Sequence, residues 1–95
     1  AALCYQLRQD GLAVATQVKI DVEYQGFILP IDYRIDLLVE DTVIIELKSV
    51  EELKPVHHKQ LLTYLRLAHK PVGLLVNFNT ADIEHSIHRK INGYI

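Results

Sequence analysis

The first residues of the chain space their apolar side chains in a way that predicts a short helix. Leu3 and Leu7 lie four residues apart and precede the polar run 8–10, which is typical of the last turns of an amphipathic helix. Gly11 follows where a left-handed C-terminal cap belongs. We therefore expect a helix that ends at about Asp10.

The next residues predict a β-hairpin. Most even positions from 14 to 24 are apolar, and the odd positions of the second half are polar, which is the period-two pattern of a strand. Gln25-Gly26 marks a turn before the apolar stretch 27–31. Pro30 has no N–H to donate to a ladder, so it confines that stretch to a sheet edge, a bulge or a strand end.

Three more segments complete an α/β pattern. Residues 33–39 and 42–48 are β-rich, and the second run is nearly continuous in apolar residues, as in a central strand buried on both faces. Pro55 suits the first turn of a helix, which we expect over residues 55–69. The apolar run 72–78 should then return to the sheet through a right-handed crossover. The predicted fold class is α/β.

The last apolar positions fit two structures. Ile83, Ile87 and Ile91 are four residues apart, which satisfies one face of a helix, but this even spacing also satisfies one face of a strand. We favour a final strand.

Length and composition predict one small globular domain over residues 1–95. Hydrophobic residues make up 49% and charged residues 23% of the chain, which excludes a disordered polyelectrolyte. No apolar run approaches the roughly 18 residues of a membrane span, and no signal peptide opens the chain, so we expect a cytoplasmic protein. Because Ala1 stands inside a helical pattern, we expect the upstream start of this helix to be missing. A small core with such a start is compatible with a homodimer.

Cysteine count and net charge exclude several further classes of site. Cys4 is the sole cysteine, so it forms no intramolecular disulfide, and no Cys/His spacing fits a zinc site; we expect Cys4 in the core. Twelve acidic and ten basic side chains give a net charge of −2, which argues against a grip on phosphate backbones by bulk charge. Lys59, Arg66 and Lys70 form a local basic stripe that either touches phosphates or is a solvated helix face.

Three ionic residues, Asp36, Glu46 and Lys48, lie within two otherwise apolar strands. A charge in such a strand costs several kcal/mol of desolvation unless it is paired or binds a metal. Glu46 and Lys48 are two residues apart and share one strand face. An antiparallel hairpin centred on Asp41 places Asp36 opposite Glu46 and Arg34 opposite Lys48, whereas a slip of one residue breaks the constellation.

With that register, two carboxylates converge beside a lysine ammonium. The Cβ atoms of facing residues lie about 5 Å apart, and hard oxygen ligands of this kind suit Mg²⁺ or Mn²⁺. The implied chemistry is metal-assisted hydrolysis, in which Lys48 orients or deprotonates the attacking water. The same residues also fit a cross-strand ion network on a solvated face, and their spacing leaves both interpretations open.

The order of these residues resembles the PD-(D/E)XK nuclease superfamily. Asp36 precedes a hairpin, Glu46-Leu47-Lys48 follows it, and a helix comes next. Ile35 stands where the motif has proline, which is a common departure in that superfamily.

Two further stretches narrow the resemblance. Gln60 and Tyr64 are similar to the Q-x-x-x-Y motif of the recombination-exonuclease branch of the superfamily. More closely, the segment from Leu12 through Phe78 resembles the bacterial GxxExxY protein family. The motif for which that family is named lies on the helix before the first strand, and this chain contains no G-x-x-E-x-x-Y.

The resemblance implies a restriction-endonuclease-like core, with a mixed central sheet flanked by helices. In the superfamily an acidic residue on the first helix often assists metal binding, so the chain would lack that ligand or contact. The site residues implied by the resemblance are Asp36 and Glu46, with the Leu47 backbone carbonyl, for the metal, Lys48 for catalysis, and Gln60 and Tyr64 for contacting substrate or orienting Lys48.

The histidines divide into one candidate and four bystanders. His57 lies three residues before Gln60 on the helix, so it can join Gln60 and Tyr64 in one polar cluster. The alternative is that Tyr64 is a core aromatic with its hydroxyl at the rim and that Gln60 is merely exposed. No ligand spacing connects the others to an acidic partner, and we expect solvated or capping roles for His58, His69, His85 and His88.

Three functions fit these observations. The leading hypothesis is a Mg²⁺- or Mn²⁺-dependent nuclease that acts on nucleic acid, with DNA favoured over RNA. The alternative is a catalytically inactive nucleic-acid-binding or protein-interaction module that retains the nuclease fold, which the negative net charge and the absent helix motif support. The third is an oligomerisation domain in which Asp36, Glu46 and Lys48 form only an ion network.

Overall fold

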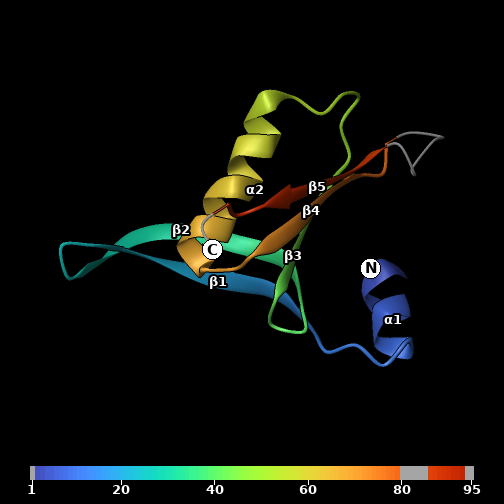
Figure 1. The fold of residues 1–95 in the computed structure, drawn as a ribbon, viewed down its shortest axis with the longest axis horizontal. Helices are drawn as coiled ribbons and strands as arrows, with labels where there is room; N and C mark the ends of the chain where they lie inside the picture. Colours follow the sequence, from blue (N-terminus) through green and yellow to red (C-terminus); the bar gives the residue numbers. More distant parts are fainter. Residues whose placement is uncertain (1, 80–85, 94–95) are drawn as a thin grey trace.

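A mixed five-stranded sheet with one helix on each face forms the framework of the protein (Figure 1). The computed structural model describes residues 2–79 and 86–93. Its elements, in chain order, are α1 (Ala2–Gln9), β1 (Val14–Tyr24), β2 (Phe27–Val39), β3 (Val43–Lys48), α2 (Pro55–Ala68), β4 (Val72–Asn77) and β5 (Ile87–Ile91). The strands lie in sequence order, with β3 and β4 parallel and all other neighbours antiparallel. The predicted α/β class is confirmed.

Both helices use the local signals that the sequence predicts. Gly11 follows α1 with a φ of +86°, and its N–H bonds to the Arg8 carbonyl at 3.0 Å. Pro55 opens α2, where the missing N–H costs no helical hydrogen bond. This helix ends at Ala68, and His69 caps it in the left-handed conformation, with a φ of 56°. The capping role expected for His69 is confirmed.

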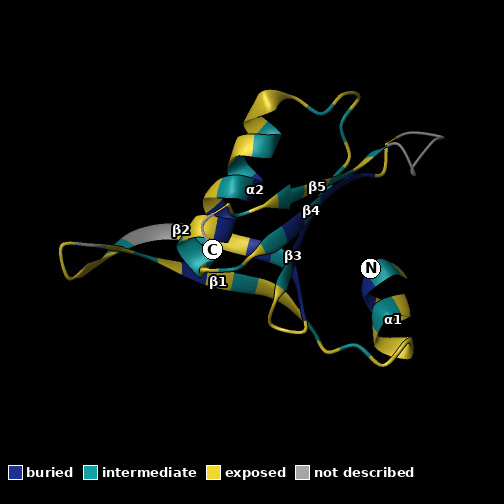
Figure 2. Ribbon diagram, in the orientation of Figure 1, coloured by how far each residue is buried: buried dark blue, intermediate teal, exposed yellow. Residues whose placement is uncertain are grey.

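Helix α2 packs on one face of the sheet through a fully buried cluster, which we call the α2-side core. Ile44, Leu61, Leu65 and Leu75 have no solvent exposure. Figure 2 shows buried positions along β4, next to α2. Gly73 permits this close packing, because a Cβ at that position would lie 2.7 Å from Leu61 Cδ1. The sheet and α2 are therefore in direct contact along β3 and β4.

A second cluster, the α1-side core, fills the opposite face. Cys4 of α1 is buried there among Leu37, Ile45 and Val76, so its predicted core position is confirmed. Ile44 and Ile45 are neighbours in β3 but belong to different cores. Strand β3 is thus buried on both faces, as its continuous apolar run predicts.

Strands β1 and β2 form a long hairpin that extends past the helices (Figure 1). The turn residues Gln25 and Gly26 both have left-handed backbones, which is typical of a tight hairpin turn. The register shifts between the Ile20–Tyr33 and Val22–Leu29 pairs, so two steps along β1 match four along β2. The proline-containing stretch is therefore a bulge within a single strand, one of the three roles that the sequence leaves open for it.

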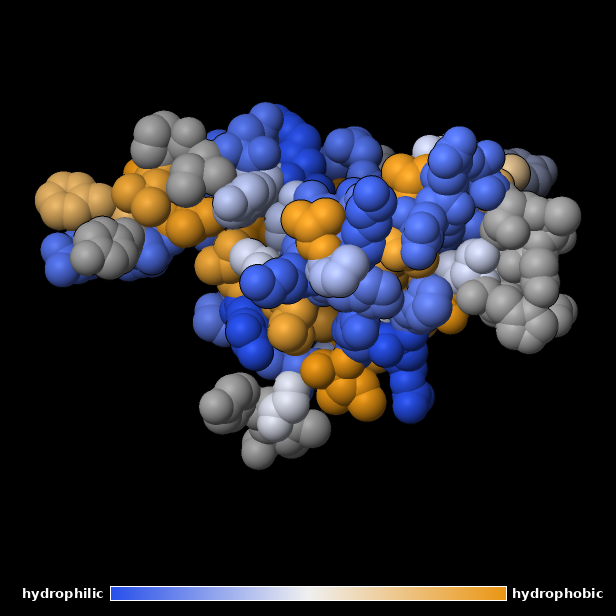
Figure 3. Space-filling view, turned by 90° about the horizontal axis from the view of Figure 1, so that it is seen from above, coloured by the Kyte–Doolittle hydropathy of each residue, from blue (hydrophilic) through white to orange (hydrophobic). Residues whose placement is uncertain are grey.

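The end of this hairpin exposes large apolar side chains. Phe27 and Ile28 are 74% and 65% exposed. Figure 3 shows apolar residues gathered at this projecting end, whereas hydrophilic side chains cover much of the rest of that face.

The hairpin changes faces near its middle. Val14 packs in the α1-side core, whereas Val18 packs against the α2-side core. The facing strand does the same, with Leu37 on the α1 side and Ile35 on the α2 side. Because a regular strand keeps residues two apart on one face, the expectation of one uninterrupted alternation along β1 is wrong. The change occurs at Gln17, whose φ is 51°.

The C-terminal part of the chain confirms the predicted final strand. β5 pairs antiparallel with β4 and forms an edge of the sheet. Ile83 and His85 lie outside the described residues. Within residues 2–79 and 86–93, neither helix has the length and apolar character needed to cross a membrane.

His58 and His88 depart from the solvated or capping roles expected of them. Both are half-buried, and their rings meet edge to face with centroids 5.2 Å apart. Burial, followed by the charge of Lys90, lowers the pKa of His58. These two histidines connect α2 to β5.

In the predicted basic stripe of Lys59, Arg66 and Lys70, one side chain is engaged in an ion pair. Lys59 and Arg66 are exposed on α2. Lys70 lies beyond the end of this helix, and its Nζ pairs with Asp41 Oδ1 at 3.0 Å. The charge of Lys70 is therefore shared with the β2–β3 turn.

Candidate active site

The candidate site lies where β2 and β3 separate. Their ladder runs from the Val39–Val43 pair to the Leu37–Ile45 pair, which is the register centred on Asp41. One step further, side chains replace the ladder: the Asp36 N–H donates to Glu46 Oε1 at 3.3 Å. The predicted juxtaposition of Asp36 and Glu46 is therefore present, and it stands in the fork between the two strands.

The same fork separates the next predicted pair. Arg34 does not face Lys48 in the ladder, which ends before it. The Arg34 Nε lies 3.1 Å from Asp32 Oδ1 on the outer half of β2 instead. Arg34 is therefore not the cross-strand partner of Lys48.

The Asp36 carboxylate is fixed by the backbone of β3. Its Oδ2 accepts the main-chain N–H of Leu47 at 2.9 Å. Its Oδ1 accepts a long hydrogen bond, 3.5 Å, from the side-chain amide of Gln17. A carboxylate has lone pairs for further partners, so Asp36 can still face a ligand in the fork.

Glu46 carries the strongest electrostatic signature of the site. It is 3% exposed. Burial, reinforced by the nearby charge of Asp36, raises the pKa of Glu46 to about 7. Among the described residues, the ion pairs join Arg34 to Asp32 and Lys70 to Asp41, and none reaches Asp36 or Glu46. Two adjacent carboxylates without a paired protein cation are an arrangement that a bound metal ion would stabilise.

Lys48 connects this carboxylate pair to α2. Its Nζ donates to Gln60 Oε1 at 2.7 Å, and Gln60 Nε2 donates to the Tyr64 hydroxyl at 3.2 Å. Tyr64 is anchored in the α2-side core, with its ring 5.6 Å from that of Tyr33 between centroids. Burial raises the pKa of Tyr64. The chain of contacts brings together Lys48, Gln60 and Tyr64, which the sequence analysis assigned to one site.

His57 does not join this cluster, so that prediction is wrong. Its Nδ1 accepts the Lys54 N–H at 2.9 Å and closes the N-terminal end of α2. Helical spacing put His57 near Gln60, but the free N–H groups of a helix start compete for a nearby acceptor. The His57 imidazole therefore bonds to the backbone at the start of α2 and not to Gln60.

The oxygen atoms in the fork are suitable ligands for a hard divalent cation. Carboxylate oxygens of Asp36 and Glu46 and the backbone carbonyl of Leu47 are the ligand types that Mg²⁺ and Mn²⁺ prefer. Within residues 2–79 and 86–93, no group of three or more His, Cys, Asp or Glu side chains is placed to hold a metal ion. A cation here would thus complete its shell with water or substrate oxygens, as Mg²⁺ commonly does.

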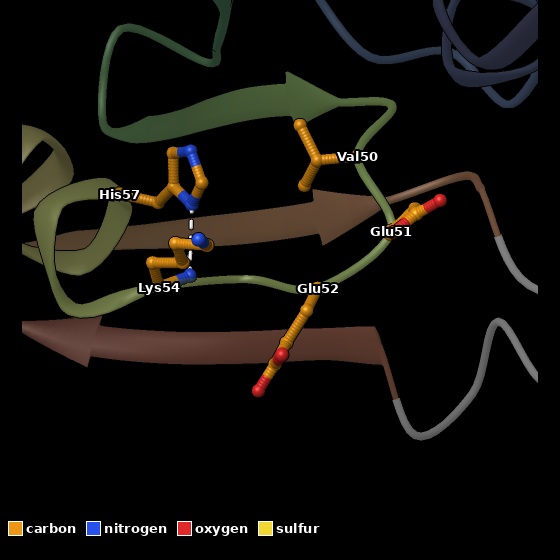
Figure 4. A pocket seen from close by; sticks show the side chains of 5 residues that line it. All are labelled: Val50, Glu51, Glu52, Lys54 and His57. Atoms are coloured by element: carbon orange, nitrogen blue, oxygen red, sulfur yellow. Dashed lines mark hydrogen bonds between the residues drawn. The ribbon is translucent and has the colours of Figure 1, made fainter.

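Two cavities differ in their relation to the fork, because only the smaller one is lined by a carboxylate of the pair. The larger, about 690 Å³, is lined by Val50, Glu51, Glu52, Lys54 and His57 between the end of β3 and the start of α2. Figure 4 shows Glu51 and Glu52 pointing in different directions around it. The smaller, about 380 Å³, is lined by Cys4, Thr16, Gln17, Asp36, Leu37 and Leu47, so it opens directly beside the Asp36 carboxylate.

Asn77 supports the site in a way that the sequence analysis did not find. This residue is 4% exposed and lies at the end of β4. Its Oδ1 accepts the Val50 N–H at 3.1 Å, and its Nδ2 donates to the Val50 carbonyl at 2.8 Å. The Phe78 N–H bonds to the Lys48 carbonyl at 2.8 Å. The segment that follows Lys48 is therefore tied to β4, and the one signal for this was an amide among apolar residues.

Comparison with known proteins identifies the kind of fold. A family model of the PD-(D/E)XK nuclease superfamily matches residues 1–90. The crystal structure of SSO0001 is similar, with 24% identity, a TM-score of 0.70, and coverage of 99% of this chain and 48% of that one. The crystal structure of LHK-Exo in complex with dAMP is similar with 23% identity, a TM-score of 0.59, and coverage of 94% and 50%. No curated protein matches the chain.

These matches also show how much of each similar protein the chain covers. The chain spans about half the length of the two solved structures. At these identities the likeness concerns the fold, and the fold agrees with the predicted restriction-endonuclease-like core. The narrower resemblance to the GxxExxY family stays a prediction.

Proposed function

The chain belongs to the PD-(D/E)XK nuclease superfamily, and from this premise we propose that it hydrolyses phosphodiester bonds of nucleic acid with the help of Mg²⁺ or Mn²⁺. The observation that carries the proposal is the pair formed by Asp36 and buried Glu46, held 3.3 Å apart between the Asp36 N and Glu46 Oε1 at the fork of β2 and β3. Lys48, on the same strand as Glu46, completes the set.

Each residue has a distinct task in the proposed reaction. Asp36 and Glu46, with the Leu47 carbonyl, would hold the divalent cation, which lowers the pKa of water and neutralises charge on a phosphoryl group. Lys48 would orient or deprotonate the water that attacks phosphorus. Gln60 holds the Lys48 ammonium through its 2.7 Å hydrogen bond and, with Tyr64, would face the phosphate.

We propose DNA as the substrate class. The similar protein LHK-Exo binds dAMP, a deoxynucleotide. The chain has a net charge of −2, so its contacts with the substrate must be local ones near the fork rather than a general attraction. The cavity of about 380 Å³ beside Asp36 offers such a place.

Cleavage assays on a conservative variant test the proposal. Labelled single-stranded and double-stranded DNA, and matched RNA, are incubated with Mn²⁺ and either the wild-type chain or Glu46→Gln. Glu52→Gln, which changes an exposed glutamate outside the fork, is the matched control. We expect Glu46→Gln to lose activity by orders of magnitude while its circular dichroism spectrum is retained, and Glu52→Gln to cleave normally.

Other results would contradict the proposal. Equal cleavage by Glu46→Gln and wild type would exclude Glu46 from catalysis. DNA binding without cleavage by a folded wild-type chain would instead support the inactive binding module, and faster cleavage of RNA would reverse the substrate assignment.

A further inference from the structure

Gln17 has an unusual backbone for a residue inside a strand. Its φ is 51°, in the left-handed region that a side chain with a Cβ rarely adopts. The other left-handed residues with side chains among those described lie in turns or at a helix end: Gln25, Glu40, Asp41 and His69. Such strain within a regular element commonly marks a functional position.

The strained residue stands across the hairpin from Asp36. The flanking pairs are Thr16 with Leu37 and Val18 with Ile35. Between these pairs, both strands change the face that they present to the two cores. At this change of face, the Asp36 carboxylate accepts the Leu47 N–H of β3.

The side chain of Gln17 completes the hold on that carboxylate. The Leu47 N–H donates to Asp36 Oδ2 at 2.9 Å, and Gln17 Nε2 donates to Asp36 Oδ1 at 3.5 Å. Gln17 and Asp36 also line the same cavity of about 380 Å³. One main-chain donor and one side-chain donor thus approach the two oxygens from β3 and from β1.

We propose that Gln17 is a positioning residue of the metal site: its amide fixes the Asp36 carboxylate in the orientation that receives the cation. This inference rests on the proposed function, because it assumes that Asp36 is a metal ligand. Groups that orient a ligand from outside the coordination shell typically change metal affinity about 10- to 100-fold when they are removed.

Two variants separate the amide from the backbone. Gln17→Gly removes the amide and tolerates a positive φ, whereas Gln17→Leu removes the amide and keeps the strain. Gln25→Gly is the matched control, because Gln25 has a φ of 50° in the hairpin turn, eight residues from Gln17. Mn²⁺ affinity is measured by calorimetry on the complete chain, and melting temperature reports folding.

We expect Mn²⁺ binding to weaken about tenfold in both Gln17 variants and to be unchanged in Gln25→Gly. Gln17→Gly should melt no lower than wild type, which shows that its loss of affinity is not a loss of structure. Wild-type affinity in Gln17→Gly would overturn the inference and leave a purely structural kink.

The Mn²⁺ affinities also distinguish a failure of the positioning role of Gln17 from a failure of the proposed metal-dependent function. If Glu46→Gln abolishes Mn²⁺ binding while Gln17→Gly binds normally, the positioning role fails and the metal site stands. If the folded wild-type chain binds no Mn²⁺, both fail together.

Discussion

Asp36 Oδ2 accepts the main-chain N–H of Leu47 at 2.9 Å, in the position where the β2–β3 ladder would otherwise continue. A backbone group, rather than a side chain, therefore aims the first carboxylate of the site. The aim depends on how the strands separate and not on the identity of residue 47, whose side chain packs against the α1-side core.

Asp36→Asn should separate charge from geometry. The asparagine oxygen can still accept the Leu47 N–H, so we expect the melting temperature to stay close to that of wild type. The variant removes one of the two negative charges in the fork, and Mn²⁺ affinity should fall by more than about tenfold. Calorimetry checks this, and an unchanged affinity would show that the cation binds elsewhere.

The stability of the metal-free protein should depend on pH through Glu46. Its pKa is about 7 in the folded chain against 4.5 as the ordinary value. Between these values the folded state binds more protons than the unfolded state, so stability is highest below about pH 4.5 from this group and falls as the pH rises to 7. The loss is of order 2–3 kcal/mol.

Urea denaturation at several pH values in the presence of a chelator measures this loss. Glu46→Gln should flatten the dependence between pH 4.5 and 7, because glutamine stays neutral. Glu52→Gln, at an exposed position, serves as the control and should follow the wild-type curve. Identical curves for wild type and Glu46→Gln would refute the assignment of the pH dependence to Glu46.

Gln60→Leu should impair turnover more than metal binding. The substitution removes the acceptor that holds Lys48 Nζ at 2.7 Å but leaves both carboxylates in place. We expect kcat to fall about 10- to 100-fold, less than the roughly 10²- to 10⁴-fold that proton transfer by a positioned group contributes, because Lys48 itself remains. Mn²⁺ affinity should be unchanged. Thr63→Ala, at an exposed position on the same helix, is the comparison. A change confined to KM would assign Gln60 to substrate binding alone.

Asn77→Leu should destabilise the fold through the segment after Lys48. The Val50 N–H and carbonyl would lose their partners in a part-buried place, which costs about 1–3 kcal/mol for each unsatisfied group. Asn79→Ala is a suitable control, because Asn79 is exposed and its contact with Asn77 comes from its backbone N–H. Equal urea midpoints for the two variants would exclude this role of Asn77.

The sequence predicted the carboxylate pair because one turn determines the register. Glu40 and Asp41 separate two apolar runs, and a hairpin closed there leaves little choice of partner for Asp36. Gln60 and Tyr64 were also accessible, since a helix places residues four apart on one side. In both cases a local spacing decides the contact.

The kink at Gln17 was beyond such reasoning. Period-two alternation assumes one buried face, whereas β1 meets α1-side side chains at Val14 and α2-side side chains at Val18. Nothing in the polar character of Gln17 distinguishes it from Lys19 on the same strand. Likewise, Asn77 acts through a loop 27 residues earlier in the chain, which no local pattern reports.

The change of face also determines how the molecule holds together. Strand β2 contributes Leu37 to one core and Ile35 to the other, so neither hydrophobic cluster is complete without it. Detaching this strand would open both cores and separate Asp36 from Glu46 in a single event. The two cores are therefore thermodynamically coupled through the residues around Asp36, and the protein should melt cooperatively, with its reactive groups dispersing in the same transition as its interior.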